Sequence, residues 1–198
     1  MKKGLEMLLE KLDKVEAGNP EMEQYSTPAG IASDILWHAY QRGDIEGKLV
    51  VDFGCGNGIF AIGAALLGGN AIGIDIDEKM IQLARKNAEK MNVKVKFIKM
   101  DVEQFNGKCD VVIMNPPFGA QYANRKADRR FLKKAMEVSN VIYSLHLEES
   151  MGFIKKFVES GGFDFFVVKK YRFPIKATMP FHKSRIKYFD VVAINVRK

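Results

Sequence analysis

The residues of this sequence best suited to do chemistry are four in a row, Asn115-Pro116-Pro117-Phe118. Two consecutive prolines fix φ and supply no N–H, so they hold the amide before them and the ring after them in one orientation. An amide oxygen, a backbone carbonyl and an aromatic face are what a site needs to hold a planar amine. We therefore expect the Asn115 side chain and the Pro116 carbonyl to accept hydrogen bonds from an amine, and Phe118 to stack on its ring. A strand terminator followed by a core phenylalanine is the alternative for this motif taken alone.

Three acidic residues lie at the ends of predicted strands: Asp52, Asp75 and Asp101. The first leads into the glycine-rich turn at residues 54–58, where the absence of side chains lets backbone approach a ligand closely. Its spacing, D-x-G-x-G-x-G, differs from the dinucleotide fingerprint G-x-G-x-x-G. We expect Asp52 to accept a hydrogen bond from a cationic amine, Asp75 to take both hydroxyls of a ribose, and Asp101 to meet the exocyclic amine of an adenine ring.

The elements that must position these residues alternate between strand and helix patterns, which indicates an α/β fold with a parallel sheet. Helices are expected at residues 4–16, 28–41, 59–67, 78–91, 131–139 and 147–159. Strands are expected at residues 48–53, 71–74, 95–99, 109–114, 141–145, 163–168 and 189–196. No helix separates the last two strands, which favours an antiparallel pair. The 198 residues are predicted to form a single domain, 1–198, with an N-terminal helical extension at 1–45 in which Ser26 or Thr27 caps the second helix.

Composition narrows the class of protein. Hydrophobic residues at 47% and charged residues at 28% are ordinary for a globular protein. No apolar run approaches the roughly 20 residues needed to cross a bilayer, and the N-terminal apolar stretch is broken by acids, so no membrane association or secretory signal is predicted. Cys55 and Cys109 have no partners at zinc spacing, which predicts reduced thiols, no metal site and a cytoplasmic location.

The net charge of +7 makes a polyanion partner plausible. Basic residues gather in a predicted loop at 120–130 and in a late connection that contains Phe181-His182-Lys183. The candidate RNA-binding residues are Arg125, Lys126, Arg129, Arg130, Phe181, His182 and Lys183. A lone histidine in a basic loop is more often an RNA contact than a catalyst, so His182 is assigned to binding, while His38 and His146 are interpreted as structural.

Together these features resemble the class I S-adenosylmethionine-dependent methyltransferases. The resemblance implies a Rossmann-like, seven-stranded, mostly parallel sheet with an antiparallel last strand and helices on both faces. Within that group, five separated motifs are similar to the archaeal and eukaryotic methyltransferase-like family that methylates N6 of an adenine in small-subunit ribosomal RNA. They are Glu23-Gln24-Tyr25-x-Thr27, Ile74-Asp75-Ile76-Asp77, Val112 to Gly119, Tyr143-Ser144-Leu145-His146 and Phe181-His182-Lys183.

The resemblance also implies roles for residues and partners. S-adenosylmethionine would be the cofactor, and its pocket would be lined by Gln24, Thr27, Gly54, Asn57, Ile59, Asp75, Asp101 and Val102. Asn115 to Phe118 would form the catalytic loop, and a small zinc-binding activator subunit would be a possible partner. Asn57 departs from the Cys or Thr of relatives, which should change cofactor affinity more than cofactor identity.

Two other kinds of function stay open on the sequence. One is methylation of a different planar amine, either guanine N2 in RNA or a glutamine amide in a protein. The other is a cofactor-binding RNA chaperone in ribosome assembly, with catalysis secondary. Measuring methyl transfer from labelled cofactor to RNA and to protein would test the first alternative. An Asn115→Ala variant that keeps full cellular function would favour the second.

Overall fold

The structure is a computed structural model of the whole chain that describes residues 1–14, 25–118, 127–176 and 186–198. Its centre is one seven-stranded sheet in the order β3-β2-β1-β4-β5-β7-β6. The strands are β1 (Leu49–Phe53), β2 (Asn70–Asp75), β3 (Val95–Lys99), β4 (Val111–Met114), β5 (Val141–Leu147), β6 (Asp164–Lys176) and β7 (Ile186–Arg197). Neighbouring strands from β3 to β5 are parallel, and β7 is antiparallel to both β5 and β6. The predicted fold class is confirmed.

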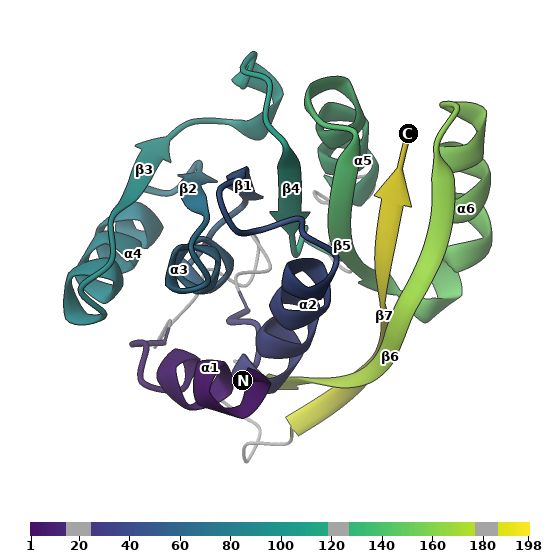
Figure 1. Cartoon of the computed structure of the whole chain (residues 1–198). Helices are drawn as coiled ribbons and strands as arrows, with labels where there is room; N and C mark the ends of the chain where they lie inside the picture. Colours follow the sequence, from purple (N-terminus) through teal and green to yellow (C-terminus); the bar gives the residue numbers. More distant parts are fainter. Residues whose placement is uncertain (15–24, 119–126, 177–185) are drawn as a thin grey trace.

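Helices cover both faces of the sheet (Figure 1). They are α1 (Lys2–Leu9), α2 (Ala29–Gln41), α3 (Ile59–Leu66), α4 (Glu78–Lys90), α5 (Ala127–Val138) and α6 (Met151–Ser160). Alternate residues of one strand enter opposite apolar layers: Val50 packs with α1 to α4, whereas Val51 packs with α5 and α6. A parallel strand buried on both faces needs an unbroken apolar run, which β1 and β4 provide. Within the described residues, no helix is long and apolar enough to cross a membrane.

The N-terminal region differs from the sequence prediction in two places. The first helix ends at Leu9 instead of residue 16, although Leu12 beyond it is still buried. Next to Leu12, the Asp13 N–H is bonded to the Asn87 side chain of α4, which takes the chain out of a helical path. The second helix ends at Gln41 as predicted but begins at Ala29, one residue later than predicted, with Pro28 as its N-cap and no capping side chain. The predicted cap by Ser26 or Thr27 is therefore wrong.

The C-terminal half differs mainly in where elements begin and end. α5 begins at Ala127, so Arg129 and Arg130 lie in its first turn and the predicted loop at 120–130 is wrong for its last residues. β6 and β7 are both longer than predicted, because they pair with each other from Asp164 opposite Arg197 to Lys176 opposite Ile186. β6 is an edge strand, the position in a sheet where a proline such as Pro174 is tolerated.

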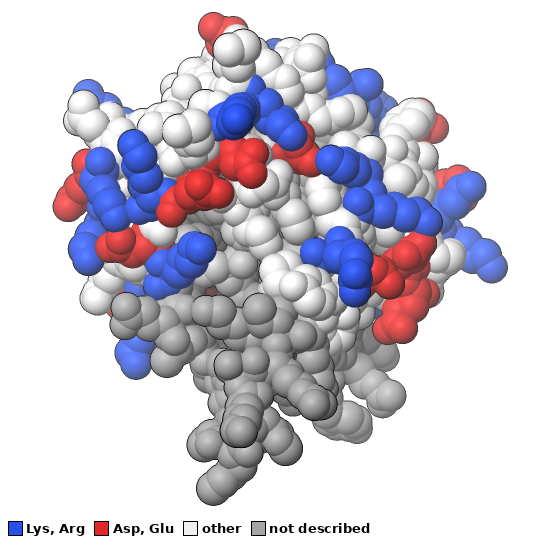
Figure 2. Space-filling view, turned by 90° about the horizontal axis from the view of Figure 1, so that it is seen from below, with Lys and Arg blue, Asp and Glu red and all other residues white. Residues whose placement is uncertain are grey.

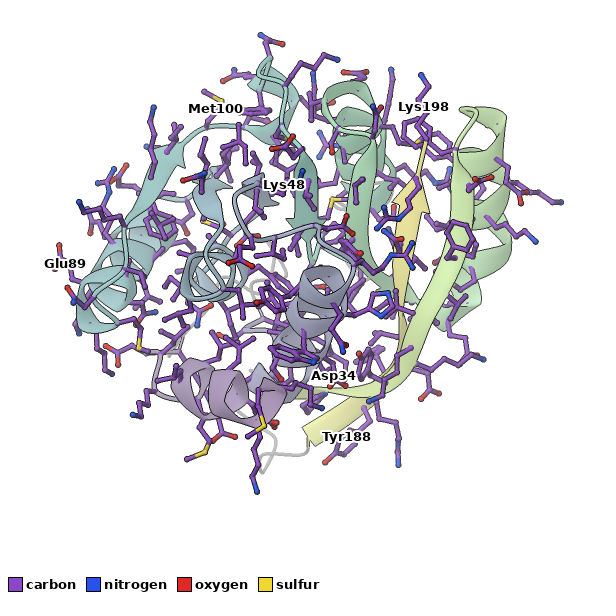
Figure 3. All side chains as sticks on the ribbon, viewed as in Figure 1. Asp34, Lys48, Glu89, Met100, Tyr188 and Lys198 are labelled. Carbon is purple, nitrogen blue, oxygen red and sulfur yellow. The ribbon has the colours of Figure 1, made fainter. Side chains whose placement is uncertain are left out.

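The long β6 strand is also joined to the N-terminal helices. Lys169 of β6 forms an ion pair of 2.6 Å with Asp34 of α2, and Lys2 of α1 pairs with the same carboxylate. Figure 3 labels Asp34 on α2 and Tyr188 on β7, at the lower edge of the molecule in this view. These ion pairs link α1 and α2 to β6, the edge strand of the sheet, close in sequence to the segment at residues 25–28.

Candidate active site

A cavity of about 300 Å³ lies at the carboxyl ends of the parallel strands. This is the edge at which open α/β sheets bind ligands. Its walls come from the segment before α2, the glycine-rich turn, the ends of β2, β3 and β4, and the first turn of α5. Ten predicted site residues line it: Thr27, Gly54, Asn57, Ile59, Asp75, Asp101, Val102, Asn115, Pro117 and Arg130.

The glycine-rich turn forms one wall of the cavity through a backbone conformation that other residues rarely adopt. Gly54, Gly56 and Gly58 have φ values of +69°, +52° and +85°, in the left-handed region that favours glycine. A Cβ at Gly58 would lie 3.1 Å from Ala84 and Phe97, whereas one at Gly56 would meet nothing within 4 Å. The turn is thus packed tightly on its inner side and open on the side of the cavity.

Asp75 lies at the end of β2, in the cavity wall and nearly buried. One carboxylate oxygen accepts the Gly56 N–H at 2.9 Å, and the other accepts the Asp77 N–H at 3.0 Å. Burial raises the pKa of this carboxyl above its usual value. Asp101 likewise accepts the Glu103 N–H at 3.0 Å and caps the short 3-10 helix Val102–Gln104. Both side chains are oriented by backbone donors and still line the cavity.

Asp52 is placed differently from the other two acids. It is 1% exposed, and one of its oxygens accepts the N–H of Ala61 in the first turn of α3 at 3.0 Å. Its other oxygen has no hydrogen-bond partner among the described residues. Burial raises the pKa of this carboxyl to about 8. Asp52 lies outside the cavity lining, although it is close enough to Asp75 for the charge of that carboxylate to raise its pKa further.

Among the described residues, only the nitrogen of the Asn115 amide, at the end of β4, has a hydrogen-bond partner. Its Nδ2 donates a hydrogen bond of 3.0 Å to Thr27 Oγ1, while its Oδ1 is buried without a partner among the described residues. Pro116 is buried and Pro117 lines the cavity. The Phe118 ring packs edge-on against Phe173 at 5.6 Å and is not in the lining. The predicted stacking role of Phe118 therefore stays a prediction, whereas Asn115 presents an acceptor that no described residue satisfies.

Two of the predicted RNA-binding residues are described. Arg130 lines the cavity and pairs with Glu103 at 3.1 Å, and the Arg129 guanidinium lies 3.7 Å from the centre of the Phe153 ring. Gln24, Arg125, Lys126, Phe181, His182 and Lys183 lie outside the described residues. On the face seen in Figure 2, Lys and Arg side chains are interspersed with Asp and Glu. Attraction of a polyanion to this face would therefore depend on individual side chains more than on one broad positive field.

Other lining residues were not predicted as site residues, among them Tyr25, Cys55 and Phe131. Tyr25 belongs to the predicted Glu23 to Thr27 motif, whereas the other two look like ordinary core residues in sequence. Burial raises the pKa of the Cys55 thiol, which keeps it protonated. Away from the cavity, His146 is buried beside Ser144 at 2.8 Å, and burial lowers its pKa to about 3, as suits a structural histidine.

Comparison with known proteins identifies the family. The sequence profile of the family described as "Methyltransferase small domain" matches residues 29–141. This chain belongs to that family. The match covers the first four strands and the cavity wall from α2 to β4, and thus includes the glycine-rich turn and Asn115.

Two named relatives and one crystal structure match this methyltransferase over more than nine tenths of its length. The Drosophila melanogaster protein named rRNA N(6)-adenosine-methyltransferase Mettl5 is 37% identical, over 94% of this chain and 92% of its own. The Danio rerio protein named rRNA N(6)-adenosine-methyltransferase METTL5 is 35% identical, over 92% of each chain. A crystal structure of a Pyrococcus horikoshii protein proposed to be an RNA methyltransferase superposes with a TM-score of 0.88 at 38% identity, covering 100% of this chain and 97% of the other. These matches confirm the predicted class I S-adenosylmethionine-dependent methyltransferase.

The cavity fits the cofactor of this class. S-adenosylmethionine carries a ribose, an adenine and a charged amino acid end, which call for oriented acceptors and for backbone that can approach closely. The structure supplies Asp75 and Asp101, both held by backbone N–H groups, beside a wall of glycines in left-handed conformation. These acceptors, and their position at the strand ends, therefore match S-adenosylmethionine, the cofactor that this class uses.

Proposed function

We propose that this methyltransferase transfers a methyl group to the exocyclic N6 amine of an adenine in ribosomal RNA, and that the RNA belongs to the small subunit. The observation that carries the proposal is the buried Asn115 Oδ1, an acceptor without a partner among the described residues. A buried acceptor left unpaired costs about 1–3 kcal/mol, so its retention beside a ligand cavity is expected where a substrate supplies the missing donor. The names of the full-length relatives point to the same amine.

The chain's contribution to the chemistry is placement. An exocyclic adenine amine is a poor nucleophile because its lone pair is delocalised into the ring. Hydrogen bonds from its two N–H groups to Asn115 Oδ1 and the Pro116 carbonyl favour a more tetrahedral nitrogen with an available lone pair. S-adenosylmethionine, when bound, supplies a methyl group already activated by a sulfonium. The nitrogen becomes acidic once alkylated, so water can take the proton and no general base is needed.

We assign the cofactor to the residues around the cavity. Asp75 takes the ribose hydroxyls, Asp101 meets the adenine amine, and backbone near Gly54 receives the amino acid end. The remaining residues assigned to the cofactor are Gln24, Thr27, Asn57, Ile59 and Val102. Asp52 is proposed to act indirectly, because its carboxyl holds the first turn of α3 next to the glycine-rich turn.

The RNA is proposed to approach over the first turn of α5. Arg130 reaches the cavity from there, and Arg129 lies one residue away on the Phe153 ring. Guanidinium groups beside a site position phosphates without specifying sequence. Phe118, Phe181, His182 and Lys183 are proposed to contact the flipped base and its neighbours, where stacking on an aromatic ring contributes about 1–3 kcal/mol per base.

The proposal extends to a partner and a location. A small zinc-binding activator subunit would need an exposed surface, and β3 and β6 are the two edge strands of the sheet, where a second chain can add hydrogen bonds. A cytoplasmic location suits the two free thiols, Cys55 and Cys109. Thermal melts with and without a candidate activator would test the first point.

Mass spectrometry of nucleosides tests the proposal. Small-subunit ribosomal RNA that lacks base methylation is incubated with the protein and labelled S-adenosylmethionine, digested and analysed. The proposal predicts labelled N6-methyladenosine, with none in a control that uses large-subunit RNA. Labelled N2-methylguanosine, or label in protein as methylglutamine, would replace the proposal with one of the alternatives.

A further inference from the structure

Thr27 and Asn115 lie 88 residues apart and meet at the wall of the cavity. Thr27 is 7% exposed and directly precedes Pro28, the N-cap of α2. Its hydroxyl does not cap that helix and instead accepts the Asn115 Nδ2–H at 3.0 Å. The N-terminal helical region thus contributes a side chain that contacts the proposed catalytic amide.

This contact engages the nitrogen end of the amide and leaves the oxygen end over. A carboxamide offers two donors on nitrogen and an acceptor on oxygen, and rotation by half a turn exchanges them. Because Nδ2 is bonded to Thr27, Oδ1 is the atom left without a partner among the described residues. An incoming group must therefore donate a hydrogen bond to satisfy it. An exocyclic amine can do so, whereas an unprotonated ring nitrogen presents only a lone pair and would be repelled.

We propose that Thr27 is a positioning residue that fixes the Asn115 amide with its oxygen toward the acceptor of the methyl group, and so selects amines over ring nitrogens. The inference rests on the proposed function of Asn115 and goes beyond the assignment of Thr27 to the cofactor pocket. If Thr27 served the cofactor alone, its loss would weaken cofactor binding and leave the rate at saturating cofactor unchanged. If it positions Asn115, the rate at saturation falls.

The test is a double-mutant cycle with Thr27→Val, Thr27→Ser, Asn115→Ala and the Thr27→Val/Asn115→Ala pair. Valine keeps the shape of threonine without the hydroxyl, and serine keeps the hydroxyl. Single-turnover methyl transfer to RNA is measured at saturating S-adenosylmethionine, with cofactor affinity measured separately by calorimetry. Thr27→Val should lower the rate by about tenfold, and Thr27→Ser should stay within about threefold of the wild-type protein. In the Asn115→Ala background, Thr27→Val should have no further effect.

A second readout needs no catalysis. The Asn115 side-chain NH2 resonances of the cofactor-free protein should shift in Thr27→Val and stay near their wild-type positions in Thr27→Ser. Unmoved resonances in Thr27→Val, an effect of Thr27→Val that persists in full without Asn115, or a rate that recovers at saturating cofactor would each overturn the positioning role. Failure of the proposed function looks different: the wild-type protein would make no N6-methyladenosine, and the NMR comparison would still decide what holds the amide.

Discussion

The Asn87 side chain of α4 donates a hydrogen bond of 2.9 Å to the backbone carbonyl of Asn57 in the glycine-rich turn. The same buried amide also binds the Asp13 backbone, donating to its carbonyl at 3.1 Å and accepting its N–H at 2.8 Å. Asn57 in turn donates from Nδ2 to the Asp13 carbonyl at 3.1 Å. One side chain therefore joins the N-terminal segment, a wall of the cofactor cavity and α4.

Asn87→Ala should be costly because it leaves the N–H of half-buried Asp13 and the carbonyl of buried Asn57 without their side-chain partner. The free energy of unfolding should fall by about 2–4 kcal/mol, as expected when several buried hydrogen bonds are removed. Cofactor affinity should fall as well, since Asn57 lines the cavity. Denaturant melts and calorimetry measure the two effects. Asn140→Ala, at an exposed asparagine, is the control and should change stability by less than about 0.5 kcal/mol.

Asp75→Ala tests the assignment of the ribose. Loss of hydrogen bonds to a charged group, each contributing about 1.5–3 kcal/mol, should weaken S-adenosylmethionine binding at least about tenfold. Calorimetry on the folded variant gives the affinity, with the exposed Asp164→Ala as a control of equal charge change. Affinity equal to that of the control would mean that the ribose lies elsewhere.

Asp52 should make stability depend on pH. Burial raises the pKa of its carboxyl from 3.8 to about 8, so the folded protein keeps a proton that the unfolded chain releases. The stabilising contribution of this group is therefore fully present below pH 3.8 and is lost as pH rises toward 8. Asp52→Asn is neutral throughout, so its stability relative to wild type should rise over this range. A gain of about 2 kcal/mol or more is expected, since one pKa unit corresponds to about 1.4 kcal/mol. Parallel stability curves for the two proteins would contradict the buried neutral carboxyl.

The salt dependence of RNA binding tests the proposed approach over α5. Replacing Arg129 and Arg130 together by alanine should weaken binding and lower the slope of log affinity against log salt by up to about 2, because each phosphate that an arginine neutralises releases counterions into solution. The control replaces Lys48 and Lys198, both exposed and labelled in Figure 3. Lys48 directly precedes β1 and Lys198 bonds to Asn140 before β5, so both lie at the amino ends of the parallel strands. Equal slopes for the two double variants would place the RNA elsewhere.

Much of the site could be predicted because parallel strands bring their carboxyl ends to one edge. Asp75, Asp101 and Asn115 each lie at or within two residues of the end of a strand, so local patterns and one topological rule were enough to collect them. The same rule collected Asp52, but a strand-end carboxylate can also turn toward the helix that follows and bind its backbone, as Asp52 does. Sequence alone gives no sign of which choice the chain makes.

Contacts between segments that are far apart in the chain could not be predicted from the sequence. The bond between Thr27 and Asn115 and the network around Asn87 join segments 88 and 74 residues apart, and nothing local encodes either. The lengths of β6 and β7 are set by their pairing with each other and not by a local apolar run. Basic residues such as Lys169 and Arg172 interrupt the apolar pattern, so the sequence predicted a shorter β6. Arg129 and Arg130 looked like loop residues because the apolar side of α5 begins only near Phe131 and Leu132.

The role of Asn115 in catalysis is tested most directly by the single-turnover rate of N6-methyladenosine formation in small-subunit ribosomal RNA for wild type and Asn115→Ala. Removing one preorganised polar group that binds a transition state should lower this rate by about a hundredfold or more. Cofactor affinity should be nearly unchanged because the cofactor acids lie on other strands. The melting temperature should fall only slightly, because among the described residues the bond from Nδ2 to Thr27 is the one side-chain hydrogen bond that is lost. An Asn115→Ala variant that methylates adenine at the wild-type rate would contradict the catalytic role of this amide.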